Sequence, residues 1–254
     1  MGHVVLDIQG PVALISLHNP EKHNAVDAPM REQLSAAYAR IEADESIRVG
    51  VIQGGDGGSF CAGGAIDGYL QNKVVGPDAA HLPRIPRPYP ATKPYIAALR
   101  GYTLGGGFAL ALACDLRIAG ESARLGPTGL KLGAVQGAKT ISRLTRLIGQ
   151  SKALEVLLLS KRLGAREAAD IGLVHTVVPD ETVLATALEW ANTIAGFSPW
   201  AVAMTKKLVY ENQHLPLDES IEREDRIASE GYSRPEALAG FSAFMAGKQN
   251  AKQG

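Results

Sequence analysis

The sequence predicts a mixed α/β protein with a helical C-terminal region, and three observations support this fold class. Short runs rich in β-branched and aliphatic residues recur through the first part of the chain. Glycine clusters join two of these runs to apolar segments of helical length. From Glu181 to about Ala246 the periodicity is helical almost throughout, with interruptions at Ser198-Pro199, Leu215-Pro216 and Arg234-Pro235.

The N-terminal elements follow from local patterns. His3–Ile8 and Val12–Leu17 are apolar runs separated by a Gly-Pro pair, which predicts a β-hairpin. Pro29–Ala43 has apolar residues at helical spacing, and Asp27 is placed to cap the helix N-terminus. Val49–Gln53 is a β-branched strand that a group of glycines ends.

The middle of the chain is expected to hold a functional loop. Ile66–Lys73 has the pattern of a helix start, and the six prolines of Gly76–Pro94 predict an irregular loop. A loop of this length in a compact domain is more often functional than idle. Tyr95–Leu99 is then a strand, Phe108–Ala113 a buried helix and Leu116–Ala119 a further strand.

The next segments are mostly helical. Ile141–Ile148, Lys152–Leu159 and Ala165–Ile171 have helical patterns, whereas Leu173–Val178 is expected to be a strand that ends at a proline. No sequence repeat, low-complexity tract or clear linker is present.

Composition and charge exclude several classes of protein. Of the 254 residues, 46% are hydrophobic and 20% are charged, the balance of a globular protein. Lys plus Arg and Asp plus Glu both number 26, so the formal net charge is zero and nothing favours nucleic-acid or membrane binding. The N-terminus lacks the pattern of a signal peptide. Cys61 and Cys114 match no metal or redox spacing and are expected to be reduced thiols of a soluble, cytoplasmic protein.

Two glycine-rich turns share one design. Ser59–Ile66 and Gly101–Phe108 both place glycines or small residues between an apolar strand and an apolar helix. Glycine allows close backbone approach, and a helix start leaves partly positive N–H groups unpaired. Two such donors that converge on one point would bind a developing oxyanion. Tight packing alone would also explain each turn, and neither turn fits a P-loop or a dinucleotide-binding motif.

The order of several motifs is more specific than either turn. Phe60-Cys61-Ala62-Gly63 is followed by Lys93-Pro94 and by Gly101-Tyr102-Thr103-Leu104-Gly105-Gly106-Gly107. Further motifs follow in sequence: Cys114-Asp115-Leu116-Arg117-Ile118-Ala119, Arg143-Leu144, Ile148-Gly149, Ala165-Arg166-Glu167-Ala168 and Gly172-Leu173-Val174. Together with His18-Asn19-Pro20 and Asn24-Ala25, this series resembles the crotonase (enoyl-CoA hydratase/isomerase) superfamily over nearly the whole chain.

The resemblance implies a spiral of repeated ββα units over residues 1–195 and a helical trimerisation region over residues 196–254. It implies an acyl-CoA thioester as substrate, with coenzyme A bound as part of that substrate and no permanent cofactor or metal. The thioester carbonyl would accept hydrogen bonds from the backbone N–H groups of Gly64 and Gly106. The substrate-binding residues that it implies are Asn24, Ala25, Ala62, Gly63 and Gly105. The expected assembly is a homotrimer or a dimer of trimers.

The chain departs from the family's hydratases at two positions. The resemblance implies two glutamates there, one as base and one as acid, which activate water for addition to the double bond. Ala109 and Gly129 occupy these positions, and neither side chain can transfer a proton. The remaining polar candidates for catalysis are Thr128, Gln136 and His81.

Several reactions therefore remain open. Thr128-Gly129 resembles the dihydroxynaphthoyl-CoA synthase branch, but Gln136 stands where that branch has an aspartate. In methylmalonyl-CoA-type decarboxylases a tyrosine falls at this position, and the nucleophile of family dehalogenases falls at Gly137. The leading expectation is an acyl-CoA enzyme other than a two-glutamate hydratase. Its alternatives are an acyl-CoA decarboxylase, a carbon–carbon bond-forming or bond-cleaving homologue, and a non-catalytic acyl-CoA binder.

Overall fold

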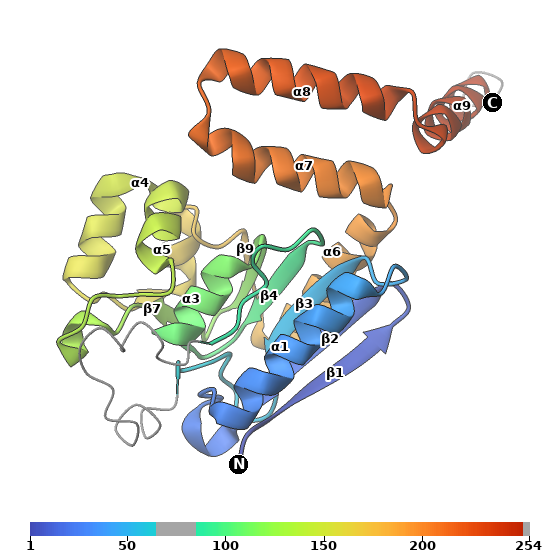
Figure 1. Ribbon diagram of the computed structural model, residues 1–254. Helices are drawn as coiled ribbons and strands as arrows, with labels where there is room; N and C mark the ends of the chain where they lie inside the picture. Colours follow the sequence, from blue (N-terminus) through green and yellow to red (C-terminus); the bar gives the residue numbers. More distant parts are fainter. Residues whose placement is uncertain (65–84, 251–254) are drawn as a thin grey trace. The chain divides into compact units, whose positions relative to one another are not determined.

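The computed structural model describes residues 1–64 and 85–250, in two compact units, Met1–Ala195 and Gly196–Gly254. The first unit is mixed α/β and the second is helical, which confirms the predicted α/β class (Figure 1). The predicted helix start at Ile66–Lys73 and most of the Gly76–Pro94 loop lie outside the described residues.

A six-stranded sheet organises the first unit, in the order β1-β2-β3-β4-β6-β9. Its strands are β1 (His3–Gln9), β2 (Val12–His18), β3 (Val49–Gly54), β4 (Tyr95–Leu99), β6 (Leu116–Gly120) and β9 (Thr176–Val178). β1 and β2 form the predicted antiparallel hairpin, and each later strand pairs in parallel with its neighbour. The carboxyl ends of the parallel strands therefore meet at one edge, where such sheets place their ligands.

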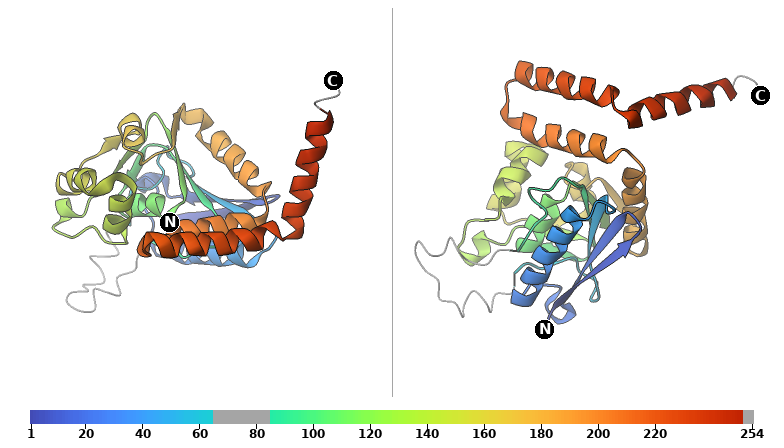
Figure 2. Two further views of the ribbon diagram at one scale, coloured as in Figure 1. Left: turned by 90° about the horizontal axis from the view of Figure 1, so that it is seen from above. Right: turned by 45° about the vertical axis from the view of Figure 1, so that its right-hand side comes forward.

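Both faces of the central strands β2, β3 and β4 are buried, and side chains alternate between the two faces along each strand. On β2, Ile15 packs in the cluster that includes α1 (Ala28–Ala43), and Leu14 packs in the cluster that includes α6 (Val183–Ala195). Figure 2 shows these two helices on opposite sides of the strands. The predicted cap of α1 is confirmed, since the Asp27 carboxylate accepts a hydrogen bond from the Met30 amide at 3.1 Å.

A second, three-stranded sheet and three helices complete the unit. The strands are β5 (Tyr102–Leu104), β7 (Arg124–Gly126) and β8 (Leu163–Gly164), and the helices are α3 (Gly106–Ala113), α4 (Thr140–Leu158) and α5 (Ala165–Asp170). Short 3-10 turns of this unit are η1 (Pro20–Lys22), η3 (Leu130–Leu132) and η4 (Asp180–Thr182), and η5 (Asn212–His214) belongs to the helical unit. Gly149, with φ 74°, interrupts α4, which agrees with the two helical segments predicted on either side of it.

The strand predicted at Leu173–Val178 is shorter than expected, since β9 begins only at Thr176. Gly172 has φ +76° and ends α5 with a left-handed turn. The amides of Leu173 and Val174 then both donate to the Ala168 carbonyl, at 2.8 and 3.1 Å. Leu173 and Val174 are thus buried as part of a helix C-cap. Their apolar character therefore predicted a strand that is longer than β9.

The helical unit contains α7 (Pro199–Glu211), α8 (Leu217–Tyr232) and α9 (Pro235–Asn250). The three breaks fall at the predicted prolines, because proline fits a helix start and disfavours helix in the residue before it. Large apolar side chains on this unit are exposed, namely Val209, Leu217, Ile221, Tyr232, Leu238, Phe241, Phe244 and Met245. Within residues 1–64 and 85–250, no helix combines the length and apolar character needed to span a membrane.

Candidate active site

Three segments that are distant in sequence meet at the ends of the parallel strands. The Ala62 amide donates to the His23 carbonyl at 3.0 Å, and the Val26 amide donates to the Gly63 carbonyl at 2.8 Å. On its other side the same segment pairs with β5, since the Leu104 amide donates to the Cys61 carbonyl at 3.0 Å. The two glycine turns are thus joined through a continuous backbone network.

This network brings Gly64 and Gly106 together. A β-carbon on Gly106 would lie 3.3 Å from the amide nitrogen of Gly64, and one on Gly63 would lie 3.3 Å from the amide nitrogen of Gly106. Neither N–H group has a hydrogen-bond acceptor among the described residues. Gly106 is the first residue of α3, so its N–H also carries the partial positive charge of a helix start. Two adjacent free donors of this kind suit an oxygen that gains negative charge.

The glycines are required by this close approach. A β-carbon on Gly107 would lie 2.0 Å from the Cys61 carbonyl oxygen, so only hydrogen fits between the two turns. Gly105 has φ 53° and ψ −112°, and Gly63 has φ +121°, conformations that L side chains rarely adopt. The second turn is tied to β7 because the Gly105 amide donates to the Gly126 carbonyl at 3.0 Å.

Asn24 orders the loop beside the first turn. Its side-chain oxygen accepts from the Asn19 amide at 2.8 Å, and its side-chain nitrogen donates to the carbonyls of Asp56 and Ser59 at 3.1 and 2.7 Å. The side chain is fully buried and Asn24 has φ 57°, a left-handed conformation that asparagine tolerates. The structure thus places Asn24 as the support of this loop, with Ala25 next to it.

The side chain of Ile85 lies against the second turn. Its Cδ1 atom would be 2.7 Å from a β-carbon on Gly106, and the residue is almost completely buried. An apolar wall therefore stands beside the two free amides on this side. His81, which the sequence offered as a catalytic candidate, lies outside the described residues.

Gln136 connects the remaining candidates to the second turn. Its side-chain oxygen accepts from the amides of Thr128 and Gly129, at 3.1 and 3.0 Å. Its side-chain nitrogen donates to the Gly105 carbonyl at 3.4 Å. The Thr128 hydroxyl also faces Gly105, since it would lie 2.6 Å from a β-carbon there. The structure therefore groups Thr128 and Gln136 with Gly105, a contact that no sequence pattern indicated.

Neither position of the expected glutamates carries an acid or a base. Ala109 is fully buried in α3, where its amide donates to the Gly105 carbonyl at 3.0 Å. At Gly129 a β-carbon would lie 2.8 Å from the Ala134 carbonyl oxygen and 2.9 Å from the Gln136 amide nitrogen. The backbone of the turn therefore occupies the space where a side chain at position 129 would begin.

Cys61 is close to the two turns but is unsuited to act as a nucleophile. Burial raises the pKa of its thiol to about 12, and its sulfur donates to the Gly63 carbonyl at 3.6 Å. The thiolate is the reactive form of cysteine, so this group stays inert near neutral pH. Cys61 and Cys114 are both free thiols. Among the described residues, no three His, Cys, Asp or Glu side chains gather closely enough to hold a metal ion.

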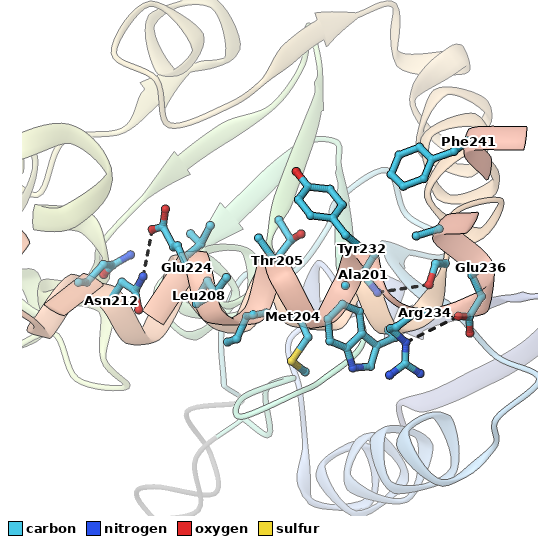
Figure 3. A pocket seen from close by; sticks show the side chains of 18 residues that line it. Ala201, Met204, Thr205, Leu208, Asn212, Glu224, Tyr232, Arg234, Glu236 and Phe241 are labelled. Atoms are coloured by element: carbon cyan, nitrogen blue, oxygen red, sulfur yellow. Dashed lines mark hydrogen bonds and ion pairs between the residues drawn. The ribbon is translucent and has the colours of Figure 1, made fainter. Parts of the chain in front are cut away.

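A separate pocket of about 920 Å³ lies within the helical unit (Figure 3). Met204, Leu208 and Phe241 are among its apolar lining residues. Its polar groups are largely paired with one another, since the Asn212 side chain bonds Glu224 at 3.1 Å and Arg234 lies 3.7 Å from Glu236. The walls of this pocket are mostly apolar, whereas the glycine turns bring two backbone donors together, so we take the glycine turns as the candidate site.

Comparison with known proteins identifies the family of the chain. The sequence profile of the family described as Enoyl-CoA hydratase/isomerase matches residues 7–252. A probable mitochondrial enoyl-CoA hydratase of Dictyostelium discoideum is 36% identical over 240 residues, covering 93% of this chain and 86% of the relative. The (E)-benzylidenesuccinyl-CoA hydratase of Thauera aromatica is 35% identical over 222 residues, which is 86% of either chain.

Solved structures give the same result. The crystal structure of enoyl-CoA hydratase from Mycobacterium tuberculosis H37Rv superimposes with a TM-score of 0.86 at 30% identity, covering 96% of both chains. A probable enoyl-CoA hydratase/isomerase from Mycobacterium abscessus superimposes with a TM-score of 0.88 at 31% identity, covering 97% of both chains. The fold, the ordered motifs and the profile match agree, and this chain is therefore an enzyme of the enoyl-CoA hydratase/isomerase family.

Proposed function

We propose that this enzyme binds an acyl-CoA thioester and stabilises the oxyanion of its enolate through the N–H groups of Gly64 and Gly106. The observation that carries the proposal is the convergence of these two amides, each without an acceptor among the described residues. A thioester carbonyl gains negative charge on its oxygen when the α-carbon becomes an enolate. Two fixed donors at that oxygen favour the charged state over the neutral one.

We further propose that the reaction does not use a pair of glutamates. Ala109 and Gly129 stand where the family resemblance implies those residues, and the backbone around Gly129 leaves no space for a side chain. Hydration needs a base for the attacking water and an acid for the α-carbon. Thr128 and Gln136, the polar side chains grouped beside these positions, do not titrate near neutral pH.

Decarboxylation fits this site better than hydration. When a carboxylate on the α-carbon leaves as CO₂, the electron pair of the broken bond passes to the α-carbon and into the thioester. The enolate then forms without a base, and only its oxyanion has to be stabilised. Cleavage of the bond between the α- and β-carbons delivers the same enolate, but it also needs a base for a β-hydroxyl group or water as the nucleophile at a β-carbonyl group. The two free amides are sufficient for the decarboxylation step, after which water protonates the α-carbon.

The decisive experiment compares two reactions of the purified enzyme. We expect crotonyl-CoA hydration, followed by loss of enoyl-thioester absorbance, to be at least ~10⁴-fold slower than in a family hydratase with both glutamates, since each proton-transfer group contributes about 10²–10⁴. CO₂ release from malonyl-CoA and methylmalonyl-CoA is measured in parallel. Rapid hydration would contradict the proposal. Turnover of neither class, with acyl-CoA still bound, would contradict the decarboxylation reading and leave carbon–carbon bond chemistry to be tested.

We also infer that the enzyme assembles as a homotrimer or a dimer of trimers through its helical unit. Phe241, Phe244 and Met245 on α9 are 51%, 62% and 58% exposed, more apolar surface than one short helix normally leaves in water. Sedimentation equilibrium should give three or six times the chain mass of 26.8 kDa. The double variant Phe241→Ser/Phe244→Ser should shift the protein towards single chains. A wild-type protein that sediments as a monomer would show this inference to be wrong.

A further inference from the structure

We propose that Gln136 is a positioning residue that orients and strengthens the Gly106 N–H donor. This inference rests on the proposed function, because it assigns a role towards the same oxyanion. Gln136 is 30 positions from Gly106 in sequence, and its contact is with the peptide group that carries this N–H.

The three hydrogen bonds of Gln136 fix the orientation of its amide. Its oxygen accepts from two backbone N–H groups, those of Thr128 and Gly129, at 3.1 and 3.0 Å. Its nitrogen donates to the carbonyl oxygen of Gly105 at 3.4 Å. The opposite orientation would turn the amide nitrogen towards two N–H donors and the amide oxygen towards a carbonyl, which loses all three bonds.

The Gly105 carbonyl and the Gly106 N–H belong to one peptide group. A peptide is planar and trans, so fixing the carbonyl oxygen also fixes the direction in which the N–H points. The Ala109 amide donates to the same oxygen at 3.0 Å. A carbonyl that accepts two hydrogen bonds polarises its peptide, and hydrogen bonds in such chains strengthen one another. Gln136 therefore acts on the Gly106 donor through the opposite end of its peptide.

The contact of Gln136 with Gly105 depends on glycine at position 129. A β-carbon at position 129 would lie 2.9 Å from the backbone nitrogen of Gln136 and 3.1 Å from the Cα atom of Gln136. The absence of that carbon lets the backbone of Gln136 approach the turn closely enough for its side chain to reach the Gly105 carbonyl. Glycine at position 129 thus leaves space for Gln136, which supports the Gly106 donor.

If Gln136 only stabilised the turn, the variants Gln136→Met and Gln136→Glu would behave differently from variants of a residue that orients the Gly106 donor. Methionine has similar length but neither accepts from the turn nor donates to Gly105 as an amide does. An ionised glutamate still accepts from the amides of Thr128 and Gly129, yet it cannot donate to the Gly105 carbonyl and repels it. When protonated, the glutamate regains an O–H donor for that carbonyl. Lys131→Met, an exposed change in the neighbouring η3 turn, is the matched control.

The readout is the absorption maximum of enzyme-bound 4-(dimethylamino)cinnamoyl-CoA, which moves to longer wavelength as its thioester carbonyl is polarised. We expect the wild type and Lys131→Met to show the full red shift, and Gln136→Met to lose most of it while its thermal unfolding temperature and thioester Kd change little. Gln136→Glu should lack the shift at pH 8 and recover it as the pH falls towards 4.5, whereas the wild-type shift stays constant over this range.

The outcomes separate this inference from the proposed function. A full red shift in Gln136→Met, or a shift in Gln136→Glu that does not depend on pH, would overturn the positioning role and leave the two-amide site intact. A wild-type enzyme that binds the probe without any red shift would instead contradict the proposed function, and the role of Gln136 with it.

Discussion

Replacing Gly106 by proline should lower turnover by about 10²–10³-fold relative to Gly106→Ala, the cost of removing one oxyanion donor. Proline has no N–H, whereas alanine retains it. Both side chains place a β-carbon 2.7 Å from the Cδ1 atom of Ile85, a flexible chain end that can shift, so this contact cancels in the comparison. The difference between the two variants therefore reports the loss of the N–H group together with the ring carbon that replaces its hydrogen.

The local structure at position 106 suits proline. Gly106 is the first residue of α3, where an N–H has no partner within the helix and where proline's fixed φ is suitable. Gly105 before it has ψ −112°, outside the right-handed helical region that a following proline disfavours. We therefore expect Gly106→Pro to fold.

Two measurements check this prediction. The first is kcat/KM with the best substrate found among the malonyl, methylmalonyl and enoyl thioesters, and the second is the red shift of bound 4-(dimethylamino)cinnamoyl-CoA. Gly106→Ala should keep most of both signals and Gly106→Pro should lose them. Equal activity in the two variants would mean that the Gly106 amide does not contact the reacting oxygen.

The second large effect is expected from Gly107→Ala, through stability. The new methyl group would lie 2.0 Å from the Cys61 carbonyl oxygen and 2.8 Å from its carbon, so backbone atoms have to move apart. Overpacking of this kind costs about 1–3 kcal/mol, and a clash with rigid backbone belongs at the upper end. The two glycine turns are held by this contact, so the same change should also separate the Gly64 and Gly106 donors.

Thermal unfolding and probe binding test the two parts of this prediction. A loss of about 3 kcal/mol corresponds to a fall in Tm of roughly 6–12 °C for a chain of this size. Gly164→Ala is the matched control, because a β-carbon there meets no atom within 4 Å. If Gly107→Ala unfolded at the wild-type temperature, the turns could not be packed as closely as the structure has them.

Local patterns predicted most of the fold. The β1–β2 hairpin, the Asp27 cap of α1, β4 and the proline breaks at the starts of α7 and α9 each depend on residues within a few positions of one another. Such features can be read from periodicity, capping and turn residues. The two glycine turns are predicted for the same reason, because the glycine clusters themselves indicate a tight turn.

Contacts between distant residues could not be predicted in this way. β5 and β7 have three residues each, too few for a strand pattern, and they exist because they pair with each other. The bond from Gln136 to the Gly105 carbonyl spans 31 positions and has no sequence signature. The sequence therefore offers Gln136 as a candidate for either a catalytic or a structural role and does not decide between the two. The paired N–H groups of Thr128 and Gly129 instead indicate a support.

The tight turn at Gly129 also means that carboxylates would be much harder to introduce at position 129 than at position 109. Ala109 already has a β-carbon, so a longer side chain there extends from an existing backbone position. Position 129 admits no β-carbon until the chain from Ala134 to Gln136 has moved away. An engineered chain would have to rebuild this turn before an acid at 129 could be tolerated, and the backbone of Gln136 is part of what would have to move. A side chain at position 129 and the present contact of Gln136 with the Gly105 carbonyl therefore compete for the same space in this turn.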